Sequence, residues 1–442
     1  MKKKLIALSL CLAMLAGAAA GCSGGGDTAS TAGGDTASTA GETGGDEGGS
    51  GDGGSAEPTT LTFWNGFTST DGDVLTEIVD RYNGENDKGV TIEMDIMTWD
   101  VFNEKLPAAI SAGQAPDFVL CSTGYYPSYV NAGSFQDLSD YFDRDGNSRD
   151  DFDTAVLEGL TYGDDLIGIP FQVVTHYLFW DKDLFSAAGL DPESPPTNWD
   201  EIKEYAGKLT DASKNQFGWL IPTDNNVVAQ YTMYAFGGDF TDEAGTTATL
   251  NSPENVEAFE WMYDVYVNMK ASPLDSDDNT YISGQLGMFI NGPWIINGLR
   301  ENEINFGVTA VPMNEGVEPK SSMIPVGFSI PITTSDEHKE LVYNFVEYWN
   351  TEDICTEWTE RCGTPAYLKS AQANFEDDPL TSVLSVPLEY GTVAMKQTGV
   401  TPVASQALYP ALEEIFAGAD IQQTLDKYNE VEQQVIDQML EG

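Results

Sequence analysis

The chain has 442 residues, of which 71 are aspartate or glutamate and 20 are lysine or arginine, so its formal net charge at pH 7 is −51. So strong an acidic excess argues against nucleic acid or an anionic membrane surface as partners. The two histidines, His176 and His338, lie far apart in the sequence. A zinc site is therefore not expected, and we predict no metal and no cofactor.

Residues 1–21 have the order of a targeting segment. A basic start is followed by an apolar stretch, Leu5 to Ala20, which is too short to span a membrane comfortably. Small residues then lead to Cys22. This order resembles a lipoprotein signal peptide, in which the cysteine receives a diacylglycerol and becomes the mature N-terminus. Ordinary secretion with cleavage near Ala20 is the alternative.

Residues 22–58 are predicted to be a flexible tether. After Cys22 the segment is Gly, Ser, Thr, Ala and acid, without aromatic or branched aliphatic residues, and the octad GGDTASTA occurs twice in tandem. About 36 flexible residues span roughly 30–36 Å. Gly49 to Gly54 fit G-x-G-x-x-G, but no strand precedes them and no helix follows, so we assign them no nucleotide.

Short strands and helices alternate next, which predicts a parallel sheet with helices on both faces. The expected strands are Leu61–Asn65, Val90–Met97 and 115–120, and the expected helices are Asp73–Asn83 and Trp99–Ala112. Ligands of such sheets bind beyond the carboxyl ends of the strands. The mouth of a site is therefore expected at Trp64–Phe67 and at Cys121–Tyr126.

The acidic segment Asp143–Asp151 is interpreted as a solvated turn. An EF-hand calcium loop needs glycine at its sixth position and glutamate at its twelfth, where this chain has Ser148 and Thr154.

The aromatic and β-branched run Phe171–Trp180 predicts a strand. It follows the tripeptide Gly168-Ile169-Pro170 and precedes a short helix that begins near Asp181 and ends at Gly189. Beyond it we expect a helix at Trp199–Leu209, with Asn198 as its N-cap.

The order GIP, extended run, WDKDLF and NWDEIKEYAGKL resembles the carbohydrate-binding proteins of ABC importers, of the maltodextrin-binding type. The segment GQLGMFINGPW, Gly284–Trp294, resembles that family's G-x-x-A-M-x-x-x-G-x-W, with Gly287 in place of the usual alanine. The resemblance covers roughly Leu61 to the end of the chain. It implies that the run Phe171–Trp180 is the first of three hinge crossings between two lobes.

The fold implied by this resemblance is α/β and two-lobed, each lobe a mainly parallel sheet flanked by helices, with a multi-strand hinge. Gly327–Ile332 and Gly363–Pro365 would be the second and third crossings. The expected N-terminal lobe is 59–172 with 329–363, and the C-terminal lobe is 173–328 with 364–442. Further helices are expected at Tyr231–Phe236, from Pro253, at Ser335–Asn350, and at Glu413–Leu440 with a break near Gly418.

The sequence lacks a P-loop, a zincin motif and a nucleophile elbow. A glycosidase remains an open alternative, because its two carboxylates carry no local motif.

Cys355 and Cys362 are seven residues apart, which is about 10 Å on an unbroken helix. A disulfide between them would require the helix to end between the two residues.

Aromatic residues are abundant, with 9 Trp, 19 Tyr and 20 Phe. Sugars offer C–H groups to aromatic faces and hydroxyls to polar side chains, so aromatics beside Asn, Asp and Gln in loops suit carbohydrate. Trp294 also resembles the family's stacking tryptophan, although packing in a core is its alternative. The predicted ligand-binding residues are Trp64, Asn65, Phe67, Asp117, Tyr125, Tyr126, His176, Asn225, Asn226, Asn291, Trp294, Gly327, Phe328 and Tyr409.

The function that these observations predict is capture of a carbohydrate, with an oligosaccharide as the expected ligand, by a monomeric extracellular protein held on the membrane through the Cys22 lipid alone. It would deliver the sugar to the permease subunits of an ABC transporter, without catalytic residues. A surface glycoside hydrolase and a sensor or adhesin without a transport role are the alternatives.

Overall fold

A five-stranded sheet lies at the centre of the first lobe. In the computed structural model, which describes residues 59–273, 280, 281 and 283–441, its strands are hydrogen-bonded in the order β2-β1-β3-β11-β6. β1 runs parallel to β2 and β3, whereas β11 runs antiparallel to β3 and β6. The strands are β1 Thr59–Asn65, β2 Val90–Ile96, β3 Phe118–Ser122, β6 Ile169–Val174 and β11 Ile324–Ser329.

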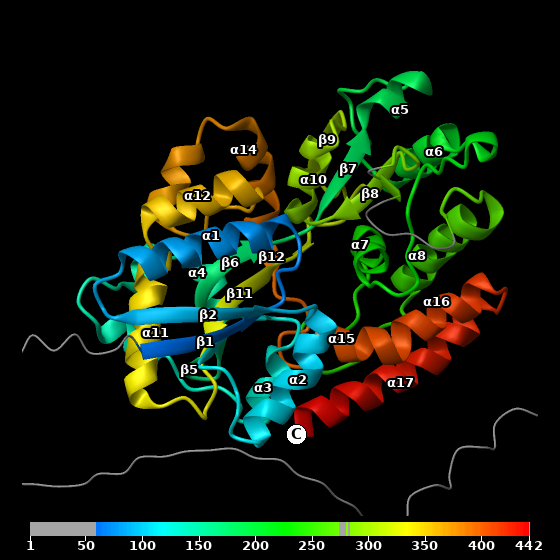
Figure 1. Ribbon diagram of the computed structural model, residues 1–442. Helices are drawn as coiled ribbons and strands as arrows, with labels where there is room; N and C mark the ends of the chain where they lie inside the picture. Colours follow the sequence, from blue (N-terminus) through cyan, green and yellow to red (C-terminus); the bar gives the residue numbers. More distant parts are fainter. Residues whose placement is uncertain (1–58, 274–279, 282, 442) are drawn as a thin grey trace, which may run out of the picture. The chain divides into compact units, whose positions relative to one another are not determined.

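Helices cover this sheet, as the alternating pattern predicts. Val74, Ile78 and Tyr82, which share one face of α1, are all buried, and Figure 1 shows α1 beside α12. The core between sheet and helices is aromatic, with Phe171 of β6 stacked on Trp349 of α11 at 4.4 Å. The helices are α1 Thr70–Glu85, α2 Trp99–Ser111, α3 Tyr126–Asn131, α4 Thr154–Gly159, α11 Asp336–Trp349 and α12 Glu352–Cys362.

A three-stranded sheet, in the order β8-β7-β9, forms the second lobe. Its strands are β7 Tyr177–Asp181, β8 Met288–Asn291 and β9 Phe306–Ala310, and both of its strand pairs are antiparallel. The expectation of a mainly parallel sheet is therefore wrong for this lobe. β8 and β9 do run parallel to each other across helix α10, Ile296–Glu301, but β7 enters from the hinge in the opposite direction and lies between them.

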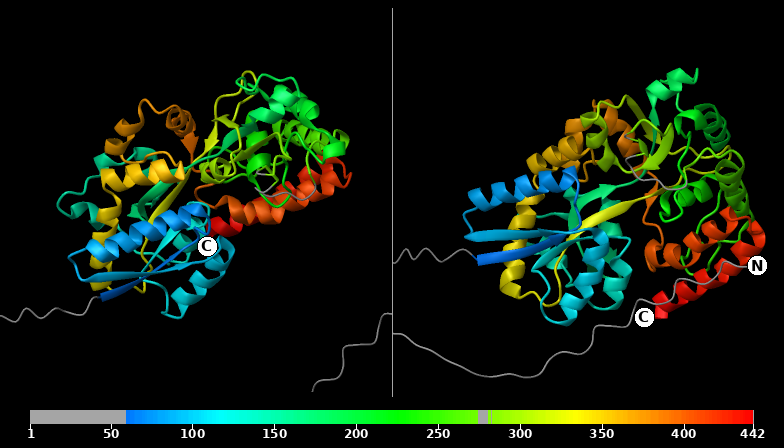
Figure 2. Two further views of the ribbon diagram at one scale, coloured as in Figure 1. Left: turned by 45° about the horizontal axis from the view of Figure 1, so that its top comes forward. Right: turned by 45° about the vertical axis from the view of Figure 1, so that its right-hand side comes forward.

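The remaining described α-helices and β-strands are shorter or lie toward the C-terminus, where α16 and α17 run side by side (Figure 2). The predicted break near Gly418 is confirmed, because Gly418 lies between these two helices. These elements are α5 Lys182–Ala187, α6 Trp199–Leu209, α7 Val227–Ala235, α8 Pro253–Tyr263, α13 Lys369–Gln372, α14 Pro379–Ser385, α15 Val400–Val403, α16 Tyr409–Phe416 and α17 Ile421–Glu441, with the strand pairs β4 Thr161–Tyr162 and β5 Asp165–Leu166, and β10 Ser321–Ser322 and β12 Gly391–Thr392.

The run Phe171–Trp180 is not one strand. It is divided between β6 of the first sheet and β7 of the second, with Thr175 and His176 connecting them. The Thr175 hydroxyl is buried and lies 3.0 Å from the Tyr231 hydroxyl and 2.5 Å from Ser321 Oγ. Buried hydroxyls thus satisfy one another where the chain passes between the lobes.

The lobe boundaries drawn from the sequence remain a prediction. Ala366 and Phe375 pack in the hydrophobic core of the first sheet, although the sequence places them in the second lobe. Cys355 and Cys362 both lie on α12, which continues unbroken between them, and both are buried and outside any disulfide.

The cap of α6 gives a first testable prediction. Asn198 Oδ1 accepts a hydrogen bond of 2.9 Å from the Glu201 amide, as the sequence predicts. Asn198→Ala should lower the free energy of unfolding by about 1 kcal/mol. Asn198→Asp keeps a capping oxygen and should unfold like the wild type in urea. Equal stability of the alanine variant and the wild type would contradict this role.

Candidate functional site

A cavity of about 480 Å³ lies beyond the carboxyl ends of β1 and β3, beside β6 and β11. This volume is in the usual range for small-molecule sites. Three of the predicted ligand residues, Phe67, Tyr125 and Trp294, line it. The lining residues are Gly66, Phe67, Thr68, Ser69, Asp71, Trp99, Ser122, Tyr125, Gln172, Val174, Trp294, Ile324, Val326, Cys362 and Thr364.

Trp294 is held in place from two sides. It follows the carboxyl end of β8, and a Cβ atom added to Gly292 would lie 1.9 Å from its Cζ3 atom, so the ring lies directly against the glycine. The His176 ring meets it edge to face at 5.7 Å. Trp294 is half-buried, packs at the edge of a core cluster and lines the cavity. It therefore packs against the core and also lines the cavity, and its stacking on a ligand stays a prediction.

Trp99 is a cavity residue that the sequence reasoning missed. It begins α2 just beyond the carboxyl end of β2, and its ring lies against Gly66, where an added Cβ would be 2.2 Å from Trp99 Cδ2. It also meets Phe67 edge to face at 5.8 Å. The rule that places ligands beyond the ends of parallel strands could have found it, had it been applied to β2 as it was to β1 and β3.

Asp71 was also missed, because the predicted helix begins at Asp73, three residues after the first residue of α1. It lies in the first turn of α1, where its Oδ1 accepts hydrogen bonds from the Ser69 hydroxyl at 2.5 Å and the Gly72 amide at 2.9 Å. Burial raises the pKa of its carboxyl group, and these hydrogen bonds oppose part of the rise. Among the described lining residues it is the one carboxylate.

Gln172 supplies an amide to the cavity from β6. Its Oε1 accepts a 2.9 Å hydrogen bond from Trp358 Nε1, which fixes the orientation of the amide and leaves the NH₂ group to donate. Ser122 and Thr364 add hydroxyls to the same lining. The walls therefore combine aromatic faces with hydroxyl, amide and carboxylate groups.

Several predicted ligand residues instead support the fold behind the cavity. Asn65 is fully buried, and its Oδ1 accepts a 3.0 Å hydrogen bond from the Phe67 amide, which shapes the loop after β1. Tyr126 and Phe328 are fully buried. A Cβ on Gly327 would lie 2.9 Å from the Tyr126 hydroxyl, so this glycine permits close packing of β11.

Asp117 and Trp64 do not line the cavity either. The Asp117 carboxylate lies at the amino end of β3, 2.6 Å from His338 Nδ1 and 2.9 Å from the Thr62 hydroxyl. Trp64 packs against the core of the first lobe. His176 is buried behind Trp294, and burial lowers the pKa of its imidazole to about 4, so it is neutral at pH 7.

The remaining predicted residues belong to the second lobe and do not line this cavity. Asn225 accepts a 2.8 Å hydrogen bond from the amide that begins α7, and Asn226 donates to Gln230 at 3.1 Å. Asn291 ends β8 and accepts a hydrogen bond from the next amide. Burial raises the pKa of Tyr409 to about 12, and the nearby Tyr125 adds to the shift, so Tyr409 lies within electrostatic reach of a cavity residue.

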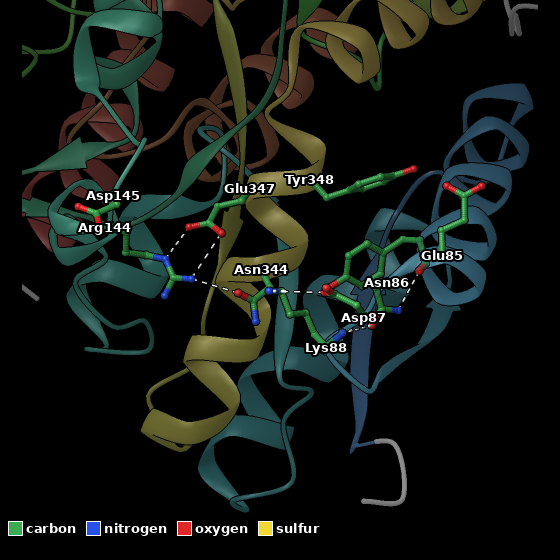
Figure 3. Close-up of a pocket in the computed structure, with 10 residues that line it drawn as sticks. Glu85, Asn86, Asp87, Lys88, Arg144, Asp145, Asn344, Glu347 and Tyr348 are labelled. Carbon is green, nitrogen blue, oxygen red and sulfur yellow. Dashed lines mark hydrogen bonds and ion pairs between the residues drawn. The ribbon is translucent and has the colours of Figure 1, made fainter. Parts of the chain in front are cut away.

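A second cavity, of about 750 Å³, lies between the end of α1 and helix α11 (Figure 3). Its two basic residues are Arg144, which donates to Glu347 at 2.6 Å and to Asn344 at 3.1 Å, and Lys88, which lies 3.5 Å from Asp87 Oδ1. Both basic residues of this wall therefore already have an acidic partner. Unlike the first cavity, it has no tryptophan among its described lining residues, and we assign it no ligand.

Within the described ranges, no group of three or more His, Cys, Asp or Glu side chains is arranged to hold a metal ion. None of the helices in the same part of the chain is both long and apolar enough to cross a membrane.

The sequence profile of the bacterial extracellular solute-binding proteins matches residues 77–382. The chain belongs to this family. A relative of this solute-binding protein, the maltotriose-binding protein of Pyrococcus abyssi, is 24% identical over 254 residues, which cover 56% of this chain and 53% of the relative.

Two solved structures resemble the fold of this solute-binding protein. An ABC transporter solute-binding protein from Thermotoga lettingae, bound with α-D-tagatose, has a TM-score of 0.76 at 20% identity and covers 85% of this chain and 99% of its own. UgpB from Mycobacterium tuberculosis, in complex with glycerophosphocholine, has a TM-score of 0.76 at 20% identity and covers 86% and 99%. The two-lobed α/β fold is therefore confirmed.

Proposed function

We propose that this protein captures a carbohydrate, most simply an oligosaccharide, in the 480 Å³ cavity and delivers it as a monomer to the permease subunits of an ABC importer. The observation that carries the proposal is the pair of tryptophans that line one cavity from different lobes. Trp99 begins α2 of the first lobe, and Trp294 follows β8 of the second. A sugar ring between them would draw the lobes together, which is the hinge closure of binding proteins.

The chemistry of the lining agrees with this ligand class. Aromatic rings accept the C–H face of a sugar, and Asp71, Gln172 and Ser122 can bond its hydroxyls. Relatives that bind maltotriose or α-D-tagatose lend support from outside the chain.

A glycoside hydrolase is less well supported. Hydrolysis uses two carboxyl groups that flank the scissile bond. Among the described lining residues the cavity offers one, Asp71. The cavity can therefore bind a sugar through its hydroxyls but lacks the partner needed to cleave the bond, and we propose no enzymatic activity.

A thermal-shift screen of the purified protein across neutral mono- and oligosaccharides tests the proposal. A ligand present at 100 times its Kd should add about 2.7 kcal/mol to the free energy of unfolding. Recovery of the same sugar intact after incubation separates binding from hydrolysis. A screen without any stabilising sugar would contradict the proposal. Unchanged sugar uptake after deletion of the gene would instead favour a sensor or adhesin.

Lipid anchoring at Cys22 belongs to the same proposal, and it lies outside the described residues. The basic, apolar and small-residue order before Cys22 supports it. Cys22→Ala should release the protein from the membrane or leave its precursor uncleaved, as seen by fractionation and immunoblotting of cells. Ser23→Ala is the control and should change neither. Normal processing and membrane retention of the Cys22 variant would contradict the prediction.

A further inference from the structure

We infer that this cavity selects uncharged sugars and rejects ligands that carry a phosphate or carboxylate group, and that Asp71 is the residue that determines this selection. The inference rests on the proposed function, because it names the ligand class of the same site.

The charge of the lining carries the first step. The described lining residues include no Lys, Arg or His, and their ionisable side chains are Asp71, Tyr125 and Cys362. Burial raises the pKa of the Tyr125 hydroxyl and of the Cys362 thiol above their usual values, so both are neutral at pH 7. Asp71 is therefore the one acid on the described wall whose ordinary pKa lies well below 7, and no basic side chain on that wall opposes it.

Two arginines, one on α12 and one on α1, are already paired. Arg361, next to Cys362, donates to Glu77 at 2.6 Å and to Glu357 at 3.0 Å. Arg81 of α1 donates to the same Glu357 at 2.5 Å. Asp100, in the first turn of α2, adds negative charge close enough to raise the pKa of Tyr125. An anionic ligand would meet no unpaired cation among these residues.

The N-terminus of α1 could have provided an anion site, because helix N-termini attract phosphate. In this chain Asp71 lies in that first turn and already accepts a hydrogen bond from the Gly72 amide. A helix dipole contributes about half a positive charge, and the carboxylate contributes a full negative one. The turn is therefore net negative toward the cavity.

A carboxylate at this place suits a neutral sugar. Oδ1 is held by Ser69 and Gly72, so the carboxylate is oriented before ligand arrives. Its other oxygen can accept from a sugar hydroxyl, and such charge-assisted hydrogen bonds are stronger than neutral ones. A phosphate at the same place would meet like charge in a partly buried site, which corresponds to a loss of affinity of about 100-fold or more.

The fold alone does not decide this selection. UgpB from Mycobacterium tuberculosis has the same fold, and its structure contains glycerophosphocholine, which carries a phosphate. The side chains of the wall, rather than the arrangement of the lobes, must therefore separate the two ligand classes.

Isothermal titration calorimetry tests the inference. The neutral probes are glucose, maltose, maltotriose and mannobiose, and the anionic probes are glucose 6-phosphate, glucuronate and sn-glycerol 3-phosphate. We expect a neutral probe to bind the wild type at least about 100-fold more tightly than any anionic probe. Asp71→Asn should lower the ratio of neutral-probe affinity to anionic-probe affinity about tenfold or more. Asp73→Asn removes an exposed charge from the same helix turn and should leave the ratio unchanged.

Asp71→Ser, which keeps a hydroxyl oxygen without the charge, serves as the second variant should the asparagine variant not fold. An anionic probe that binds the wild type within tenfold of the best neutral one would overturn the inference and leave the binding function standing. Rejection of anions that persists in both Asp71 variants would overturn the role of Asp71. Binding of neither probe class would overturn the proposed function, and the inference with it.

Discussion

Trp294→Ala should lower the affinity for the sugar by roughly 1–3 kcal/mol, on the scale measured for stacking of bases on aromatic side chains. The ring lines the cavity, and Gly292 and His176 hold it in place before ligand arrives. Because the side chain is only half-buried, its loss should destabilise the apo protein less than the loss of a core tryptophan. Titration calorimetry and an apo melting curve of the same variant measure both quantities.

Two further variants sharpen this prediction. Trp199 is fully buried in the core of the second lobe, so Trp199→Ala should cost about 3–5 kcal/mol of stability. Gly292→Ala keeps the tryptophan but adds a Cβ 1.9 Å from its ring, so it should displace the ring and weaken binding. A well-folded Trp294→Ala protein with wild-type affinity would remove Trp294 from the site.

The stability of the protein should fall as the pH rises, because of Glu432. This residue of α17 is fully buried, and both of its carboxylate oxygens lack hydrogen-bond partners among the described residues. Burial raises the pKa of its carboxyl group to about 9, an effect that the nearby backbone of Leu250 partly offsets and the field of Asp239 increases. Glu432 is thus protonated in the folded protein at pH 7.

The sign follows from proton binding. The unfolded glutamate titrates near pH 4.3, so between that pH and about 9 the unfolded state binds fewer protons than the folded state, and stability decreases as the pH rises. The slope is at most about 1.4 kcal/mol per pH unit, and the total loss is on the order of 5 kcal/mol. The stabilising contribution is complete below about pH 4 and is lost toward pH 9.

Urea unfolding of Glu432→Gln between pH 5 and pH 9 measures this effect. The amide cannot ionise, so the variant should lose much less stability than the wild type over this range. Glu430→Gln changes an exposed glutamate on the same helix and should follow the wild-type curve. Parallel curves for all three proteins would show that Glu432 is not the cause.

The sequence predicts most elements of this fold, because they follow local rules. The N-cap of α6 is Asn198, the end of α5 lies near Gly189, and the buried face of α1 has the predicted spacing. The run Phe171–Trp180 shows where local rules end. Its composition predicts extended backbone, and only the pairing of distant strands shows that β6 and β7 belong to different sheets.

Only part of the candidate site could be predicted, because local sequence signals mark some of its residues and not others. Phe67 and Tyr125 follow strand ends, and Trp294 follows a turn with a family resemblance, so each carried a signal. Asp117 carried no such signal, because its position at the amino end of β3 depends on where the strand begins. Glu432 lies where the apolar stripe of α17 is buried, yet a charged residue suggests a solvent-facing position.

A crystal structure of the protein with the sugar that binds best would test the central claim most directly. We expect sugar rings in the 480 Å³ cavity, with one ring against Trp294, another contact to Trp99 or Tyr125, and a hydroxyl on the carboxylate of Asp71. Sugar bound in the second cavity, between α1 and α11, with the cavity beside Trp294 empty, would contradict the site proposed for this solute-binding protein.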